Sequence, residues 1–449
     1  MDADSIRSRR RNASGRKDPG RLRLLPIGWA LTFCFAAALI VLAGLTWLAL
    51  ALLHYPKIPA TGRVSLHDFV SVLQLVFASV AGAGALVALV MAYRRQRVAE
   101  TASAHDRSRV LNERFTTIAE QLGSSQAAIR LAGIHAMAGL ADDWEENRQT
   151  CIDVICAYLR MPYAPEPPEP ASPDDRSRLA WQGFREVRHS AIRIIGAHLR
   201  DSAEVSWQGR DFDFTGVVFD GGNFRGAVFS GGTVSFSGAD FRDGRVDFHG
   251  ARFSGSEVSF GSARFSGASV DFGETEFSGG RVHFRQAEFA GGLVDFGRAR
   301  FAGAAVSFWL SLVSGGLVDF SVAEFSGSVV GFDNAKFTGG RVSFQHARFT
   351  DGEVVFLSTE FAGADADFLG AQFSGGTVSF RFAQFSQGTV SFRAAGFCGA
   401  AVSFANARLL GGSLNFAHPA EWSTPPVFDW PEPPPPGVTL PGGSARAAP

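Results

Sequence analysis

The residues of this chain whose types could support chemistry are few and scattered. The ten His are dispersed along the sequence, and the four Cys form no C-x-x-C motif. The sequence contains no P-loop, no H-E-x-x-H zinc motif and no G-x-S-x-G nucleophile motif. We therefore expect no enzyme activity, no catalytic residues, no cofactor and no metal site.

The individual His and Cys fit structural roles. His283 and His346 lie at positions where neighbouring units carry Asp, Ser or Arg, which is typical of an exposed strand position. Cys151 and Cys156 lie in a helical stretch and are interpreted as core thiols instead of a redox pair. The scattered Cys suit a reducing compartment better than a disulfide framework.

One regular set of polar residues remains as a candidate binding face. These residues stand between a Val and a Phe, where strand alternation points them outward. The set comprises Ser235, Asp247, Ser259, Asp271, His283, Asp295, Ser307 and Asp319. The alternative is a solvated strand face with no binding role.

The elements that position this set form a repeat. Phe is the exceptional residue of the chain, with 42 copies, and the net charge is only -1. From Phe229 onward one Phe recurs every 12 residues, with Val313 and Leu409 in its place at two steps, and a second Phe follows seven residues after the first, as in Phe241 and Phe248. Ala usually stands two residues before the first Phe and Gly two residues after it. A large and a small side chain thus alternate inward, so stacked units bury what one unit cannot.

The charges decide the length of one coil. The residue before each first Phe points outward, and a 24-residue coil would stack Arg252, Glu276, Arg300 and Glu324 in one column of alternating sign. A 12-residue coil would place Arg252 on Arg264, and like charges on adjacent strands are unfavourable. We therefore predict a four-sided coil of 24 residues, about eight coils and a rod roughly 40 Å long.

The repeat resembles those of pentapeptide-repeat proteins. The units Ala239-Asp240-Phe241 and Ala251-Arg252-Phe253 resemble the A-(D/N)-(L/F)-x-x unit of that family, and the run from Phe214 to Phe229 has its spacing of five. The resemblance implies a right-handed quadrilateral β-helix over 205–418. The chain departs from the family by alternating spacings of five and seven residues.

The N-terminal quarter predicts a membrane anchor. Residues 1–24 are basic and are expected to be disordered, and 25–93 are expected to form a transmembrane hairpin of spans 27–53 and 69–93. The N-terminal segment holds eight Lys or Arg, and the loop between the spans holds two. This bias predicts that both termini are cytoplasmic. The spans resemble those of membrane-anchored bacterial members of the family, which implies the bacterial cell membrane.

The remaining segments complete a mixed fold. Residues 94–200 predict an α-helical linker domain with a Pro-rich loop at 162–173, whose last helix is expected to cap the first coil. The tail, 419–449, contains Trp422, Trp430 and a run of four Pro, and is expected to be disordered.

The function expected from these features is a non-catalytic, membrane-tethered scaffold for protein–protein interaction. An alternative is a ligand sensor or a cryptic enzyme with a pocket at the helical cap. A third hypothesis, implied by the family, is a DNA mimic that inhibits topoisomerases. The mixed charge of 202–420 disfavours it, and no nucleic-acid partner is expected. The sequence does not name the protein partner.

Overall fold

The computed structural model describes residues 66–163, 176–431 and 433–442, together with six separate positions between 36 and 51. The predicted disordered segment 1–24, nearly all of the predicted span 27–53 and most of the loop 162–173 lie outside the described residues. The chain divides into two compact units, residues 1–110 and 111–449.

Helix α2 (Leu66–Leu122) begins in the first unit and ends in the second, and it contains the predicted span 69–93. Among the residues that the structure describes, no helix has both the length and the apolar composition needed to cross a membrane.

The second unit begins with a small helical domain. It contains the end of α2, α3 (Ala127–Asp143), the 3-10 helix η1 (Glu145–Asn147), α4 (Arg148–Leu159) and α5 (Arg176–His198). Ile134, Met137 and Leu140 of α3 are buried, as their helical spacing predicts. Ile129, near the start of α3, is exposed.

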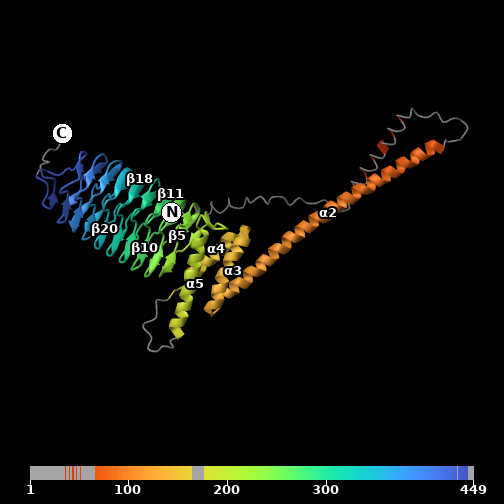
Figure 1. Ribbon diagram of the computed structural model, residues 1–449, viewed down its shortest axis with the longest axis horizontal. Helices are drawn as coiled ribbons and strands as arrows, with labels where there is room; N and C mark the ends of the chain where they lie inside the picture. The colour runs from red at the N-terminus through yellow and green to blue at the C-terminus, as the bar shows by residue number, and fades with distance from the viewer. Residues whose placement is uncertain are drawn as a thin grey trace, which may run out of the picture. The chain divides into compact units, whose positions relative to one another are not determined.

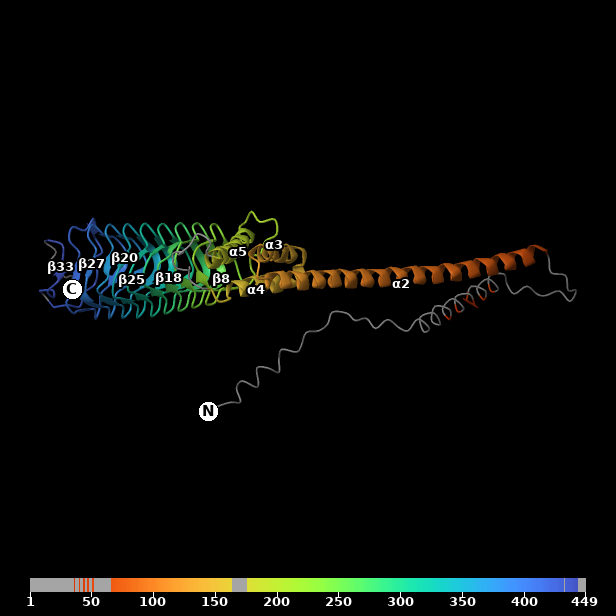
Figure 2. The same ribbon diagram turned by 90° about the horizontal axis from the view of Figure 1, so that it is seen from below.

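Helix α5 lies on the first coil of the solenoid (Figure 2). Gly196 makes the close approach possible, because a Cβ atom there would lie 2.2 Å from the carbonyl oxygen of Asn223. Ile192 packs beside Gly222, at 3.1 Å from the position of a Cβ atom there. The helix thus covers the edge that the first coil would otherwise expose.

The solenoid consists of three parallel sheets of 14, 10 and 9 strands (Figure 1). The 14-stranded sheet contains β1 (Phe212–Asp213), β4 (Val228–Phe229), β5 (Thr233–Ser235), β8 (Arg252–Ser259), β11 (Glu276–His283), β14 (Arg300–Phe301), β15 (Ala305–Ser307), β18 (Glu324–Gly331), β21 (Arg348–Val355), β24 (Gln372–Phe373), β25 (Thr377–Ser379), β28 (Gly396–Phe397), β29 (Ala401–Ser403) and β32 (Glu421–Trp422).

The 10-stranded sheet contains β3 (Gly222–Asn223), β7 (Arg245–Asp247), β10 (Ser269–Asp271), β13 (Leu293–Asp295), β17 (Leu317–Asp319), β20 (Arg341–Ser343), β23 (Asp365–Asp367), β27 (Thr389–Ser391), β31 (Ser413–Asn415) and β33 (Val438–Thr439). The 9-stranded sheet contains β2 (Val218–Phe219), β6 (Asp240–Phe241), β9 (Arg264–Phe265), β12 (Glu288–Phe289), β16 (Leu312–Val313), β19 (Lys336–Phe337), β22 (Glu360–Ala362), β26 (Gln384–Gln387) and β30 (Arg408–Leu409).

Each turn of the solenoid has four faces. The 14-stranded sheet bends at a corner, so it supplies face 1, which contains Phe253, and face 2, which contains Val258. The 9-stranded sheet forms face 3, and the 10-stranded sheet forms face 4. Each turn contributes one strand to the 9-stranded sheet. The solenoid therefore has about nine turns instead of the eight predicted.

The register confirms the coil of 24 residues. Phe241 pairs with Phe265, and Phe253 pairs with Phe277. The paired rings stack, with centroids 4.7 Å apart for Phe241 and Phe265. Arg252, Glu276 and Arg300 stand on successive strands of face 1, as the charge pattern predicts.

The C-terminal tail differs from its prediction of disorder. Strands β32 and β33 join the sheets after the last full turn, and Trp422 packs on Phe397 at a ring-centroid distance of 5.1 Å. Phe428 stacks on Phe404, and the indole N–H of Trp430 donates to the carbonyl oxygen of Ala407 at 3.0 Å. These aromatic side chains pack against the last rings of the core, which no further coil covers.

Two positions of the Phe column on face 3 carry a smaller residue, Val313 within the column and Leu409 at its end. Val313 stands between Phe289 and Phe337 and is buried. The ring of Phe337 is turned by 72° from that of Phe361, whereas the rings of Phe265 and Phe289 lie within 4° of parallel. Because Val fills less of the core than Phe, the neighbouring ring turns out of the stacked arrangement of the column.

The smaller side chain of Val313 predicts that Val313→Phe stabilises the solenoid. A ring at this position would stack on both neighbours and bury more apolar surface, which is worth about 1 kcal/mol. The reverse change in a regular part of the column, Phe265→Val, should cost about 2–3 kcal/mol. Denaturant unfolding of both variants measures the two effects, and a lower midpoint for Val313→Phe would contradict the prediction.

Candidate functional site

The outward polar set predicted from the sequence divides between two faces. Because one turn has 24 residues, alternate members fall on different sheets. Ser235, Ser259, His283 and Ser307 lie on face 2. The carboxylates stand on successive strands of face 4, and we call them the acidic column: Asp247, Asp271, Asp295 and Asp319.

Each carboxylate of the acidic column caps a turn. The backbone N–H two residues further on donates to the carboxylate, at 2.8 Å from Gly273 to Asp271 and at 2.7 Å from Gly297 to Asp295. This local bond is the reason for Asp at the end of each strand. Asn415 receives the same bond from Ala417 at 2.9 Å. The turn therefore requires an acceptor oxygen and does not require a negative charge.

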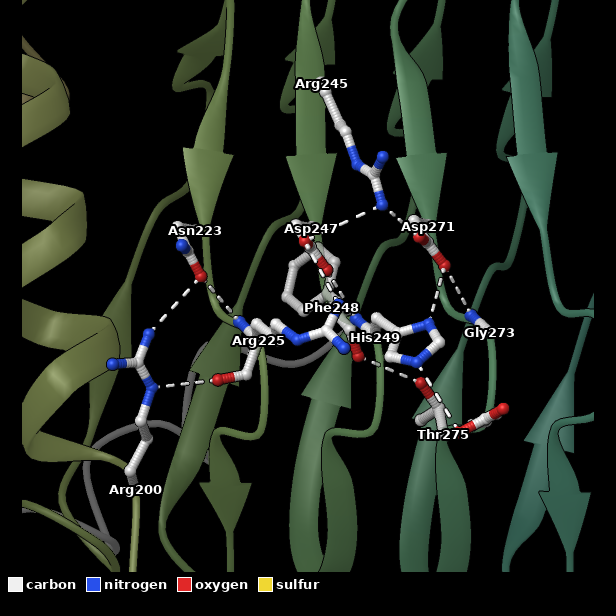
Figure 3. A network of polar contacts seen from close by, with 11 residues as sticks. Arg200, Asn223, Arg225, Arg245, Asp247, Phe248, His249, Asp271, Gly273 and Thr275 are labelled. Atoms are coloured by element: carbon white, nitrogen blue, oxygen red, sulfur yellow. Dashed lines mark hydrogen bonds and ion pairs between the residues drawn. The ribbon is translucent and has the colours of Figure 1, made fainter. Parts of the chain in front are cut away.

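Basic side chains accompany the first half of the column (Figure 3). Arg245 reaches both neighbours, at 2.6 Å to Asp271 and 3.7 Å to Asp247. Arg225 lies 3.9 Å from Asp247, and His249 lies 3.6 Å from Asp271. These contacts screen the first two carboxylates from each other.

The second half of the column lacks such partners. Among the described residues, Asp295 and Asp319 have no ion pair. Burial raises the pKa of Asp295, and the charges of Asp319 and Asp271 raise it further against the opposing bond from Gly297. The column therefore presents an uncompensated negative charge at Asp295 and Asp319.

The acidic column is not arranged as a metal centre. It supplies one carboxylate per strand, and strands lie about 4.8 Å apart. Within the part of the chain that the structure describes, no three His, Cys, Asp or Glu side chains are placed to hold a metal ion.

The charged columns of faces 1 and 3 alternate in sign. On face 3, Arg264 lies 3.1 Å from Glu288, and Lys336 lies 3.5 Å from Glu360. These exposed pairs link adjacent turns, and each contributes at most about 1 kcal/mol. The acidic column differs from them because its charges have the same sign.

A second polar cluster lies where α5 meets the first turn. Asp220 accepts hydrogen bonds from Tyr163 at 2.6 Å and Arg185 at 2.8 Å, and His189 lies 2.9 Å from its other oxygen. Arg188 is buried, donates to the carbonyl oxygen of Leu159 at 2.6 Å and lies over the Tyr163 ring. Sequence reasoning missed this cluster, because its members are far apart in the chain and form no motif.

The electrostatics of this cluster are those of a structural junction. Burial alone would raise the pKa of Asp220, but the bonds from His189, Tyr163 and Arg185 outweigh it and hold the pKa far below its usual range. Burial lowers the pKa of Arg188. All of these polar groups bond to one another or to backbone, so they fix α5 on the solenoid.

The candidate thiols and imidazoles lie apart from each other. Cys151 and Cys156 are buried, and burial raises their pKa to about 11 and about 12, which makes them unreactive. His283 lies on face 2, and burial lowers its pKa. His346 lies at a turn between faces 4 and 1. The structure brings none of them together.

Comparison with known protein families gives one match. Residues 214–261 match the family described as pentapeptide repeats (9 copies). Comparison with curated proteins and with solved structures gave no match.

The charge on Asp295 predicts a gain in stability for Asp295→Asn at neutral pH. The amide keeps the bond from Gly297 and removes repulsion from two neighbours, which is worth about 0.5 kcal/mol. Because the folded state raises the pKa of Asp295, its ionised form destabilises the fold above that pKa, and protonation on acidification removes this penalty. The gain should therefore shrink as the pH falls through the raised pKa.

Unfolding midpoints of both forms, measured from neutral to acidic pH, check this prediction. Asp367→Asn is the matched control, because the strand neighbours of Asp367 are Ser343 and Ser391. An equal gain for both variants would mean that repulsion within the column is not the cause.

Proposed function

We propose that this chain, whose solenoid contains pentapeptide repeats, is a scaffold that binds another protein through face 4. The observation that carries the proposal is the uncompensated charge of Asp295 and Asp319, which the local turns do not require. The partner should present basic side chains to the acidic column.

The repeat suits this role because its surface has a fixed pitch. Carboxylates on successive strands stand about 4.8 Å apart, and the stacked core beneath them leaves little freedom to rearrange. A preorganised row of charges loses little conformational entropy when a partner binds. Such a surface favours recognition of a partner over chemistry on a small substrate.

The two other hypotheses have less support. A mimic of duplex DNA needs a continuous acidic surface. Face 3 alternates in sign, and Arg225 and Arg245 stand on face 4 itself. A ligand sensor would need a pocket at the helical cap, where Asp220 and Arg188 instead bond to neighbouring groups.

The scaffold proposal predicts that charge removal from the column abolishes binding without loss of fold. The variant is Asp271→Asn, Asp295→Asn and Asp319→Asn together in the full chain. Each amide keeps its turn, so the unfolding midpoint should not fall. Proximity labelling in the native host should then lose the proteins that the parent chain labels, by about tenfold or more, because several charge contacts are lost together.

The control removes the same number of negative charges from other faces, by Glu276→Gln, Glu288→Gln and Glu360→Gln. It should keep the labelled proteins. Equal labelling by the parent and the column variant, or loss in both variants, would contradict binding through face 4.

We further propose that the scaffold is tethered to a bacterial cell membrane with both termini in the cytoplasm. This proposal rests on the sequence alone, through the apolar runs 27–53 and 69–93 and the excess of basic residues before the first run.

The tether predicts that the full chain stays in the membrane fraction after an alkaline carbonate wash. Deletion of residues 27–93 should release it to the soluble fraction, because the apolar runs would be the anchor. A basic segment alone would bind only electrostatically, and the wash would remove it. Recovery of the full chain in the soluble fraction would refute the tether.

A further inference from the structure

We propose that face 2 is a self-association surface, on which a second copy of this chain packs with its solenoid axis antiparallel to the first. The proposal concerns a different face from the acidic column and does not depend on the scaffold function. It rests on the residues that point outward along strands β5, β8, β11, β15, β18, β21, β25 and β29.

The two central strands of face 2 carry no charged residue on this face, and the nearest carboxylate is that of Asp333 at the following turn, 2.6 Å from the position of a Cβ atom at Gly331. Ala305 and Ser307 point outward from β15, Val329 stands beside Ala305 on β18, and Gly331, which is buried, stands beside Ser307. Ala305 is exposed, and Val329 keeps 51% of its surface exposed. We call these four residues the neutral strip. Small, flat and partly apolar side chains on a sheet allow another sheet to approach closely.

Aromatic and apolar side chains extend the strip to the corner of the turn. Trp309 is partly exposed there, and Leu310 keeps 37% of its surface exposed. The guanidinium of Arg285 lies over the Trp309 ring, 4.6 Å from its centroid. A Trp and an Arg of this kind are the side chains that contribute most to protein interfaces.

Opposite charges stand on the two sides of the neutral strip. Arg281 pairs in register with Ala305 on one side, and Glu353 pairs with Val329 on the other. Both side chains are exposed. Within the described part of the chain neither one forms an ion pair, and Glu257 on β8 stands in register with Arg281 on its far side. The strip therefore has a basic edge and an acidic edge, three strands apart.

This arrangement is complementary to itself. A two-fold axis parallel to the strands, between β15 and β18, places Arg281 opposite the partner's Glu353 and Ala305 opposite the partner's Val329. By symmetry each contact occurs twice, as a closed dimer requires. A shift of the axis by half a strand spacing toward β11 would place Glu257 opposite the partner's Glu353, which is unfavourable. The charges thus favour the first register over this shifted one.

The outward residues on the other strands of face 2 are also compatible with this two-fold axis. It places Glu257 opposite the partner's Thr377, and Thr233 opposite the partner's Ala401, so no like charges of this column meet. The axis also lies midway between β5 and β29, so all eight strands of the face overlap. A face about 38 Å by roughly 14 Å gives about 1,000 Å² over both copies, the lower limit for a specific interface. The dimer should therefore be weak and reversible.

Charge reversal in the full chain tests this register. Arg281→Glu creates two contacts between like charges in one dimer, and so does Glu353→Arg. Each single variant should weaken dimerisation about tenfold or more, because the attraction is replaced twice by repulsion. The double variant Arg281→Glu with Glu353→Arg restores opposite charges and should return to within about threefold of the parent.

Co-purification of two differently tagged copies from the same cells measures association, and sedimentation velocity of the purified chain gives the dimer fraction against concentration. Arg341→Glu is the matched control, because Arg341 also begins a strand and is exposed, but on face 4. Circular dichroism shows whether each variant keeps the solenoid.

The expected result is a dimer for the parent and the control, weaker association for each single reversal and recovery in the double variant. A chain that is monomeric at every concentration would overturn the proposal, as would single reversals with unchanged association. Weakened single variants without recovery in the double variant would overturn the register. Association that survives Val329→Arg would show that another surface joins the copies.

Discussion

The stacking of phenyl rings along the interior is the interaction on which the rest of this solenoid depends. Ring centroids of Phe236 and Phe260 lie 4.7 Å apart, which matches the spacing of hydrogen-bonded strands. A smaller residue in a column changes the packing of its neighbours, and Phe337 beside Val313 meets Phe361 edge-on instead of stacking on it. The rings therefore fix both the pitch of the coil and the identity of nearly every inward residue.

The same pitch constrains the outward residues. A charge on one strand lies one strand spacing from the equivalent position of the next turn, so a column of one sign repels itself. Faces 1 and 3 avoid this by alternation, as Arg264 and Glu288 do. Face 2 has no charged residue on its two central strands, β15 and β18, at the positions that belong to this face. Face 4 alone keeps four carboxylates in a row, and only its first half has basic partners.

The sequence predicts the structure correctly where a single periodic pattern determines it. The inward Phe and the alternating charges specify a 24-residue turn, and the register agrees with it. The outward polar set has a period of 12 in the sequence, and the 24-residue turn divides it between faces 2 and 4. The junction at Asp220 was missed because Tyr163 and Arg185 reach it from distant segments. The Pro content of the tail predicts disorder, whereas its aromatic residues pack on the last turn in the structure.

The positions of the two proposed surfaces on the coil bear on how they would act together. Faces 2 and 4 are opposite sides of a four-sided turn, so self-association through face 2 leaves the acidic column uncovered in each copy. An antiparallel dimer would present two acidic columns pointing outward and running in opposite directions. A partner with one basic segment would bind each column independently, whereas a partner with two linked segments would gain avidity only if its linker could span the dimer. Because the dimer is weak, the number of acidic columns that one assembly presents to a partner would rise from one to two as the local concentration of the chain increases.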